Sequence, residues 1–287
     1  MQYKWIVTKA ETSLTLLQYL HNKLQDQKLQ DKTLSLKKIK SMIDAGYCYI
    51  NAKKERFYRT LVSPGMRIEL AIPEQTALEF IFEDDDILVV NKPVGITCDD
   101  RLVAALAKLD KKIELVHRLD KETTGLLLCA KKPAVKTYLL AQFKQHAIEK
   151  AYVAIVDGVV KEQSGQIENY LGPIHRYEGH VKWGAVTHDG HYAATNWQLL
   201  QRGTNASMLL LVPMTGKTHQ LRVHTSGMGH PILGDHTYAK SFRCQYRAPR
   251  VLLHAATLRF KHPTQNKIVE LSCEPPADFT ACLQELF

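Results

Sequence analysis

The chain of 287 residues lacks the features that mark several large classes of protein. Its longest apolar runs, such as Gly125–Ala130 and Leu209–Val212, are far shorter than the ~20 residues that a membrane-spanning helix needs. No basic-then-apolar start with a small-residue cleavage site follows Met1, so we expect no secretory signal and no membrane partner. Apolar residues make up 45% of the chain and charged residues 23%, a globular composition that excludes a disordered chain, a collagen and a coiled coil.

Cysteine is scarce, and no two cysteines stand at the C-x-x-C spacing. The six are Cys48, Cys98, Cys129, Cys244, Cys273 and Cys282. We therefore expect reduced, mostly buried cysteines in a cytoplasmic protein, and neither a disulfide framework nor a zinc site.

The sequence also lacks the glycine-rich loops that cradle nucleotides. No G-x-G-x-x-G follows a strand candidate, and Gly216-Lys217-Thr218 has Leu211 where a phosphate loop requires glycine. Neither a dinucleotide-binding enzyme nor a nucleoside-triphosphatase is indicated.

The net charge of +9 is unevenly distributed along the chain. Residues 1–76 contain 13 Lys or Arg and 7 Asp or Glu, whereas residues 77–287 contain 25 and 22. A small basic module suggests a polyphosphate partner, of which nucleic acid is the commonest. A solvated charged surface is the alternative interpretation. We place a domain boundary between residues 76 and 77.

Residues 1–76 follow an ordered pattern of short elements. The pattern predicts a helix over Ser13–Leu24, a basic helix from Ser35 to Gly46, a strand at Tyr47–Ile50, a turn at 51–54 and a strand at Arg67–Ile72. The order resembles the S-four-like RNA-binding domain. The resemblance implies that the basic helix and the turn face RNA phosphates, with contacts from Lys37, Lys38, Lys40, Lys53 and Lys54.

Residues 77–287 contain many short strand candidates and few helix candidates. Because the strands do not alternate regularly with helices, we expect an α+β fold with a mixed, largely antiparallel sheet. The helix candidates are Leu102–Leu109 and Pro133–Gln145. The strand candidates are Leu78–Phe82, Ile87–Asn91, Leu126–Cys129, Ala151–Val156, Met208–Val212, Val251–Phe260 and Lys267–Ser272.

A polar loop, Val116–Gly125, opens directly into the apolar run that begins at Leu126. Within this loop Asp120 stands among Arg118, Lys121 and His117, and nearby cations favour an ionised carboxylate. An ionised carboxylate held at the edge of a cleft is a candidate nucleophile. Judged locally, a salt-bridged structural loop explains the same residues better.

Residues far from this loop favour the catalytic interpretation over the structural one. The loop and five further blocks, in order, resemble the RluA-type pseudouridine synthases, which isomerise uridine to pseudouridine in RNA. The further blocks are 83–95, 150–154, 216–224, 229–238 and 252–263. The resemblance covers residues 78–287 and implies a reaction that needs no cofactor and no metal.

The resemblance assigns a role to each of five residues. Asp120 corresponds to the carboxylate that attacks the target nucleotide, and Arg222 to the arginine paired with it. Tyr152 corresponds to the aromatic residue that stacks on the uracil, with proton transfer as a further role. Arg118 corresponds to the side chain that replaces the flipped nucleotide, and Leu253 to the apolar contact under the base.

Two further cations of these blocks, Lys150 and Lys217, are candidate RNA contacts. The chain departs from the family pattern in having Thr124 where serine is usual and Lys217 where arginine is usual. Lysine lacks the planar fork of arginine, which puts the strength of a phosphate contact at Lys217 in doubt.

The region after Lys217 is predicted to be a helix over 219–226, capped by Thr218. His219 and His224 lie five residues apart and cannot share a metal on a helix or a strand, so we assign them hydrogen-bonded structural roles.

Two other classes of function compete with the synthase interpretation. A glycosidase or base-excision enzyme needs paired carboxylates, and only Glu122 stands near Asp120 in the sequence. A non-catalytic RNA-binding or ribosome-assembly factor is suggested by the basic module, although Asp120, Tyr152 and Arg222 are all present. As substrate we expect large-subunit ribosomal RNA, with transfer RNA as the alternative, and we expect a monomer.

Overall fold

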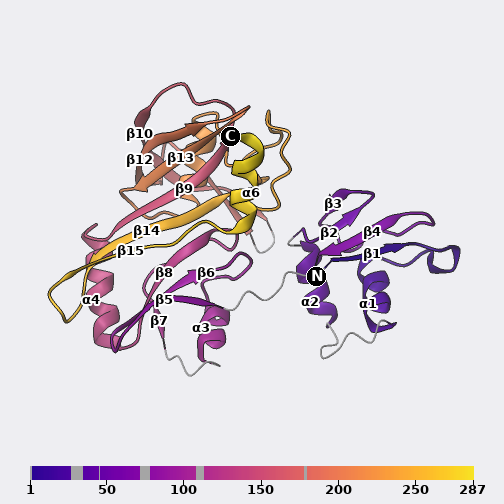
Figure 1. The fold of residues 1–287 in the computed structure, drawn as a ribbon, viewed down its shortest axis with the longest axis horizontal. Helices are drawn as coiled ribbons and strands as arrows, with labels where there is room; N and C mark the ends of the chain where they lie inside the picture. The colour runs from indigo at the N-terminus through magenta and orange to yellow at the C-terminus, as the bar shows by residue number, and fades with distance from the viewer. Residues whose placement is uncertain (1, 27–34, 45, 72–77, 108–112, 178–179) are drawn as a thin grey trace. The chain divides into compact units, whose positions relative to one another are not determined.

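The computed structural model describes residues 2–26, 35–44, 46–71, 78–107, 113–177 and 180–287. The chain divides into two compact units, Met1–Ala77 and Leu78–Phe287 (Figure 1). The boundary expected between residues 76 and 77 falls within 72–77, outside the described residues. In the part of the chain that is described, no helix is both long and apolar enough to cross a membrane.

The first unit is a four-stranded antiparallel sheet of order β1-β4-β2-β3 with two helices. Its elements are β1 (Gln2–Ile6), the short helix η1 (Lys9–Glu11), α1 (Leu16–Asp26), α2 (Leu36–Asp44), β2 (Cys48–Ile50), β3 (Lys53–Glu55) and β4 (Arg67–Ala71). Leu16 and Leu20 of α1, and Ile39 and Ile43 of α2, are fully buried, because residues four apart lie on one face of a helix. This small sheet with its helices is consistent with an S-four-like module.

Two details of the first unit differ from the sequence-based expectation. Lys53 and Lys54 belong to β3, so the turn consists of Asn51 and Ala52, which both have positive φ. The strand β1 was not predicted, although it pairs with β4 along its whole length.

The second unit is built on one large sheet, and its fold class is the predicted one (Figure 1). The strand order is β11-β10-β12-β13-β9-β14-β8-β6-β5, with β15 beside β14 and β7 beside β8. All of these pairs are antiparallel except β14 with β8. The strands are β5 (Glu79–Glu83), β6 (Ile87–Lys92), β7 (Glu114–Leu115), β8 (Thr124–Ala130), β9 (Glu149–Asp157), β10 (Ser164–Tyr177), β11 (His180–Val186), β12 (His191–Arg202), β13 (Ala206–Pro213), β14 (Leu253–Lys261) and β15 (Ile268–Ser272). The helices are α3 (Asp100–Ala107), α4 (Pro133–Lys144), α5 (Gln220–Gly227) and α6 (Ala277–Leu286).

The parallel contact between β8 and β14 requires glycine at one position. Gly125 has φ of +110°, a conformation that other residues rarely adopt, and a β-carbon there would overlap the backbone of Ala255. The close approach brings the loop before β8 beside the first residues of β14. This juxtaposition positions the candidate site.

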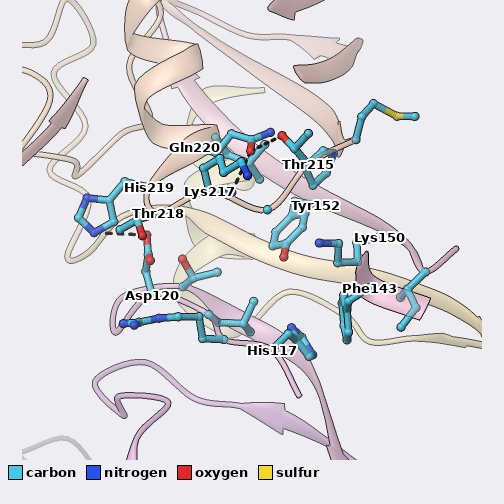
Figure 2. A pocket seen from close by; sticks show the side chains of 18 of the residues that line it. His117, Asp120, Phe143, Lys150, Tyr152, Thr215, Lys217, Thr218, His219 and Gln220 are labelled. Carbon is cyan, nitrogen blue, oxygen red and sulfur yellow. Dashed lines mark hydrogen bonds and ion pairs between the residues drawn. The ribbon is translucent and has the colours of Figure 1, made fainter. Parts of the chain in front are cut away.

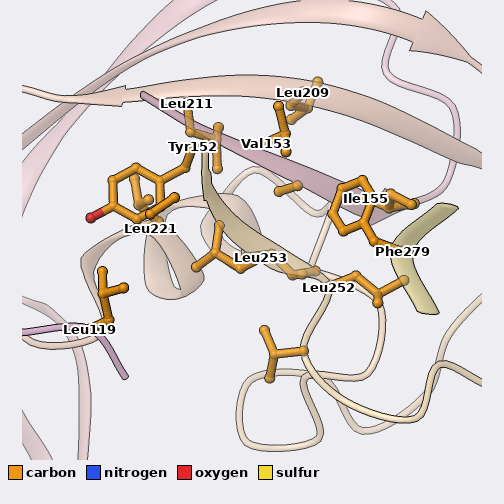
Figure 3. Close-up of a cluster of buried hydrophobic side chains, with 14 of the residues drawn as sticks. Leu119, Tyr152, Val153, Ile155, Leu209, Leu211, Leu221, Leu252, Leu253 and Phe279 are labelled. Atoms are coloured by element: carbon orange, nitrogen blue, oxygen red, sulfur yellow. The ribbon is translucent and has the colours of Figure 1, made fainter. Parts of the chain in front are cut away.

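The main core of the second unit reaches from this juxtaposition to the last helix. Figure 3 shows Leu119, Tyr152 and Leu253 toward one end of the cluster and Phe279 of α6 toward the other. Phe279 is fully buried. The C-terminal helix is therefore part of the same packed interior as the loop that carries Asp120.

Candidate active site

A cavity of about 540 Å³ opens where six segments of the second unit meet (Figure 2). It is lined by the loop before β8, the end of α4, β9, the turn after β13, the start of α5 and the start of β14. All the residues singled out in the second unit line it, namely Arg118, Asp120, Lys150, Tyr152, Lys217, Arg222 and Leu253. Segments more than a hundred residues apart in the chain supply them.

Asp120 faces two side chains, that of Arg222 in α5 and that of His219 just before this helix. Nη1 of Arg222 donates to Oδ2 of Asp120 at 3.3 Å, and Nε2 of His219 lies 3.8 Å from the same oxygen. The side chain of Asp120 keeps 21% of its surface exposed, so it stays accessible from the cavity. The chosen aspartate and the chosen arginine are therefore in contact.

Arg222 nevertheless makes its stronger bonds to another carboxylate. Its Nε and Nη2 donate to the two oxygens of Asp235 at 2.7 and 2.9 Å, and Asp235 is only 1% exposed. The ring of Tyr238 lies 5.1 Å from the guanidinium carbon. Burial disfavours the charge, but the hydrogen bonds and charge of Asp235 outweigh it and raise the pKa of Arg222 above its usual range.

Sequence reasoning did not single out Asp235 or Tyr238. Both lie in the block 229–238, which was matched to the family without a role for any of its residues. Because Asp235 is thirteen residues from Arg222, no local spacing rule connects them.

His219 was predicted to be the first residue of a helix capped by Thr218, and the structure differs. It is the residue before α5, with φ of +57°, so it and not Thr218 occupies the cap position. Its Nδ1 lies 2.8 Å from the hydroxyl of Tyr238 while Nε2 faces Asp120 (Figure 2). Burial lowers the pKa of His219, and the charge of Asp120 opposes that shift. His219 is therefore part of the candidate site and not only a structural residue.

His117 was expected among the cations around Asp120, and this expectation is wrong. Its Nε2 accepts a hydrogen bond from the backbone N–H of Leu128, and its ring packs against Phe143. Burial, with a smaller effect of Lys150, lowers the pKa of His117 to about 3, so the ring is neutral at physiological pH. The cation that contacts Asp120, Arg222, comes instead from a distant segment.

Tyr152 and Lys150 lie on the same face of β9, because alternate residues of a strand share a face. Tyr152 is 8% exposed, and both burial and the charge of Asp120 raise the pKa of its hydroxyl, which keeps it protonated. Leu253 is buried at the start of β14 and lines the same cavity. Burial lowers the pKa of Lys150, whose Nζ lies 5.5 Å from the ring centre of Phe143.

The turn that carries Lys217 is held by Gln220. The side-chain oxygen of Gln220 accepts from the Thr215 hydroxyl at 2.7 Å and from the Lys217 backbone N–H at 3.0 Å. Its amide nitrogen donates to Thr195, which also contacts His224. His224 thus has the structural, hydrogen-bonded role predicted for it.

The cavity contains one carboxylate and several cations. Among the lining residues Asp120 is the only Asp or Glu, whereas Arg118, Lys144, Lys150, Lys217 and Arg222 are Lys or Arg. A glycosidase that works with paired carboxylates does not fit this lining. Within the described residues no group of three or more His, Cys, Asp or Glu could hold a metal ion.

The lysines of the first unit that were predicted to contact RNA lie on α2 and β3. Lys37 and Lys53 are exposed, and Lys54 is half-buried. Nζ of Lys40 lies over the ring of Tyr58, 4.3 Å from its centre. The side chain of Lys38 lies outside the described residues.

Comparison with known proteins gives one answer. Residues 86–227 match the family described as RNA pseudouridylate synthase. Ribosomal large subunit pseudouridine synthase D of Zymomonas mobilis is 37% identical over 231 residues, which cover 72% of each chain. The protein of the same name from Haemophilus ducreyi is 30% identical, with 96% of this chain and 94% of that protein covered.

A solved structure agrees with these relatives. The human RNA pseudouridylate synthase domain containing 1 matches with a TM-score of 0.62 and 30% identity, over 74% of this chain and 90% of that one. Asp120, Tyr152 and Arg222, which line the cavity, lie within the matched residues 86–227. The chain therefore belongs to the RNA pseudouridine synthase family, and it is an isomerase that acts on uridine in RNA.

Proposed function

We propose that this enzyme converts uridines of large-subunit ribosomal RNA to pseudouridine, with Asp120 as the nucleophile. The observation that carries the proposal is the lining of the cavity, in which a single carboxylate, Asp120, faces Arg222 and shares the space with Tyr152. A lone fixed carboxylate suits covalent catalysis, which needs one nucleophile and no paired acid.

The reaction keeps every atom of the nucleotide. Asp120 attacks the nucleotide, the bond between the sugar and N1 of uracil breaks, and the base rotates. A bond then forms between the sugar and C5, the carboxylate is released, C5 loses its proton and N1 gains one. The balance needs no oxidant, reductant or donor group.

Arg118, Tyr152 and Leu253 handle the base in this proposal. A stacked uracil must leave its helix, which costs a few kcal/mol. Arg118 is exposed at the cavity and fills the gap in the RNA, while Tyr152 offers a π-face to the extruded base. Because the hydroxyl of Tyr152 stays protonated, it acts by stacking or as a proton donor, and not as a free phenolate base.

Lys150 and Lys217 bind RNA phosphates next to the target nucleotide in this proposal. Among the described residues that line the cavity, the cations outnumber the single carboxylate, Asp120. The cavity therefore attracts negatively charged groups. A β-carbon at Gly216 would lie 3.8 Å from Nζ of Lys150, which places that cation beside the Lys217 turn. Two cations from separate segments thus flank one end of the cavity.

The choice of ribosomal RNA rests on the relatives and on the basic first unit. Relatives that match over 72% and 96% of this chain are named large-subunit synthases. We assign residues 1–76 to RNA tethering through Lys37, Lys38, Lys40, Lys53 and Lys54, and residues 77–287 to catalysis. Salt-dependent phosphate contacts of this kind add affinity without reading sequence.

Mapping of pseudouridine in total RNA tests the proposal. Cells that lack the gene should lose one or more pseudouridines of large-subunit ribosomal RNA, and a plasmid with the natural gene should restore them. The Asp120→Asn variant should bind RNA within several-fold of the natural protein and restore none. Sites lost only from transfer RNA would contradict the ribosomal assignment, and turnover by the variant, after deamidation is excluded, would remove Asp120 as nucleophile.

A further inference from the structure

A buried arginine connects the C-terminal helix to the loop that carries Asp120. Arg250, just before β14, is only 4% exposed. Its Nε and Nη2 donate to the two oxygens of Asp278, in the first turn of α6, at 2.6 and 2.8 Å. None of its atoms lines the cavity, so the established reaction gives this pair no role.

The third nitrogen of Arg250 faces the site. Nη1 donates to the carbonyls of Val251 at 2.9 Å, Glu122 at 3.3 Å and Leu253 at 3.4 Å. Glu122 follows Asp120 by two residues, and Leu253 lines the cavity, as Tyr152 does. One planar guanidinium therefore spans the catalytic loop, the start of β14 and α6.

A second contact holds the same loop two residues further along the chain, where β8 begins. Nδ1 of His254 lies 2.9 Å from the hydroxyl of Thr124, and its Nε2 lies 3.1 Å from the carbonyl of Cys273. With the end of the loop fixed there, the bond from Arg250 to Glu122 is a further tie, which connects the loop to the segment just before β14.

We infer that Arg250 is a positioning residue, which Asp278 orients so that the loop holds Asp120 at the reactive distance. The inference rests on the proposed role of Asp120. Guanidinium is suited to this task because its donors form a rigid fork, whereas the ammonium of lysine is a point charge on a flexible stem. Displacing a catalytic group by about 1 Å can cost ~100-fold in rate.

The Asp278→Asn variant of the full-length protein tests the inference under single-turnover conditions with saturating RNA. We expect a rate ~10- to 100-fold lower, an RNA affinity within twofold, and faster hydrogen exchange at the amide of Thr123, which bonds to the carbonyl of Asp120. Asp278→Glu should recover part of the rate. Glu149→Gln is the matched control, because it breaks an exposed arginine–carboxylate pair, in which Arg259 of β14 contacts Glu149 of β9.

The assays are run at a temperature where circular dichroism shows every variant to be folded, and Arg250→Lys gives a second, independent disruption. Slower turnover in Asp278→Asn and Arg250→Lys, with Glu149→Gln unaffected, supports the inference. A lower melting temperature with an unchanged rate in both variants overturns it and leaves the pair as a structural one. If the natural protein itself forms no pseudouridine, the proposed function fails instead, so the two failures are distinguishable.

Discussion

At the scale of single residues, Arg222 divides its hydrogen-bonding capacity between two carboxylates. Asp235, which is buried, takes Nε and Nη2, and only Nη1 remains for Asp120. The rigid fork is thus oriented by a buried residue that does not line the cavity. Because Asp235 already balances the charge of Arg222, Asp120 is held in place while its negative charge is only partly compensated, which suits the nucleophilic role that we propose for it.

The Asp235→Asn variant should therefore lose both activity and stability. Removing one partner of a buried ion pair costs up to ~3–5 kcal/mol, and the released arginine is free to collapse onto Asp120. We expect turnover to fall by more than tenfold and the free energy of unfolding in urea to drop toward that range. Glu114→Gln, which breaks the half-exposed pair with Lys136, should change stability by ~1 kcal/mol or less. Equal effects of the two substitutions would contradict this division of roles.

His224 makes the folded state sensitive to mild acid. Burial lowers its pKa to about 4 from an ordinary value of 6.5, and the neutral ring satisfies Thr195 and Asn169. Between pH 6.5 and 4 the unfolded chain binds the extra proton, so stability present above pH 6.5 is lost as the pH falls, by up to ~1.4 kcal/mol per pH unit. Urea unfolding from pH 7 to 4.5 should show a flatter pH dependence for His224→Asn than for the natural protein. Parallel curves would contradict the assignment.

At the scale of elements, the contact between β8 and β14 depends on the absence of a side chain at Gly125. In Gly125→Ala, backbone strain of ~1–3 kcal/mol adds to the overlap with Ala255, so the two strands must separate and move the loop that carries Asp120. We expect a lower melting temperature and little activity per folded molecule. Gly227→Ala is the control, since a β-carbon there meets nothing within 4 Å, and alanine favours a helix by up to ~1 kcal/mol. Full activity of Gly125→Ala would show that the strands tolerate separation.

Some elements and contacts could be predicted from the sequence and others could not, for physical reasons. The continuous apolar run of β8 and the periodic apolar stripes of α1 and α2 are strong signals, and the structure has these elements within a few residues of the expected ends. The strands β10, β11 and β12 were missed. β10 has a register shift between Pro173 and His175, and most of its residues are exposed. The alternation of apolar and polar residues that marks a strand is therefore weak. The pair Arg222–Asp235 depends on tertiary packing, which no local pattern encodes.

At the scale of the whole molecule, the two units should separate chemistry from affinity. Residues 1–76 carry two thirds of the net charge, while the cavity lies within the second unit. A chain of residues 78–287 should fold and retain turnover at saturating RNA, but bind more weakly. If the first unit neutralises ~3 phosphates, the slope of log affinity against log salt should become shallower by ~2–3.

The salt slope is a sharper measure than one dissociation constant, because it counts charge contacts. Identical slopes for the full-length and shortened chains would remove the tethering role. A shortened chain that is folded but inactive would show that the first unit helps to form the site.

The place of β14 in the sheet has a consequence for how the protein is made. It is the next-to-last strand in the chain, yet it lies in the middle of the sheet, between β9 and β8. A nascent chain that has not yet released residues 253–261 from the ribosome therefore holds two half-sheets with open edges, one with Asp120 and the other with Tyr152. Such non-local pairing is slow, and open edges invite association with other chains. Residues 253–261 must thus leave the ribosome before the enzyme can acquire activity, and a message truncated before β14 should yield an insoluble product.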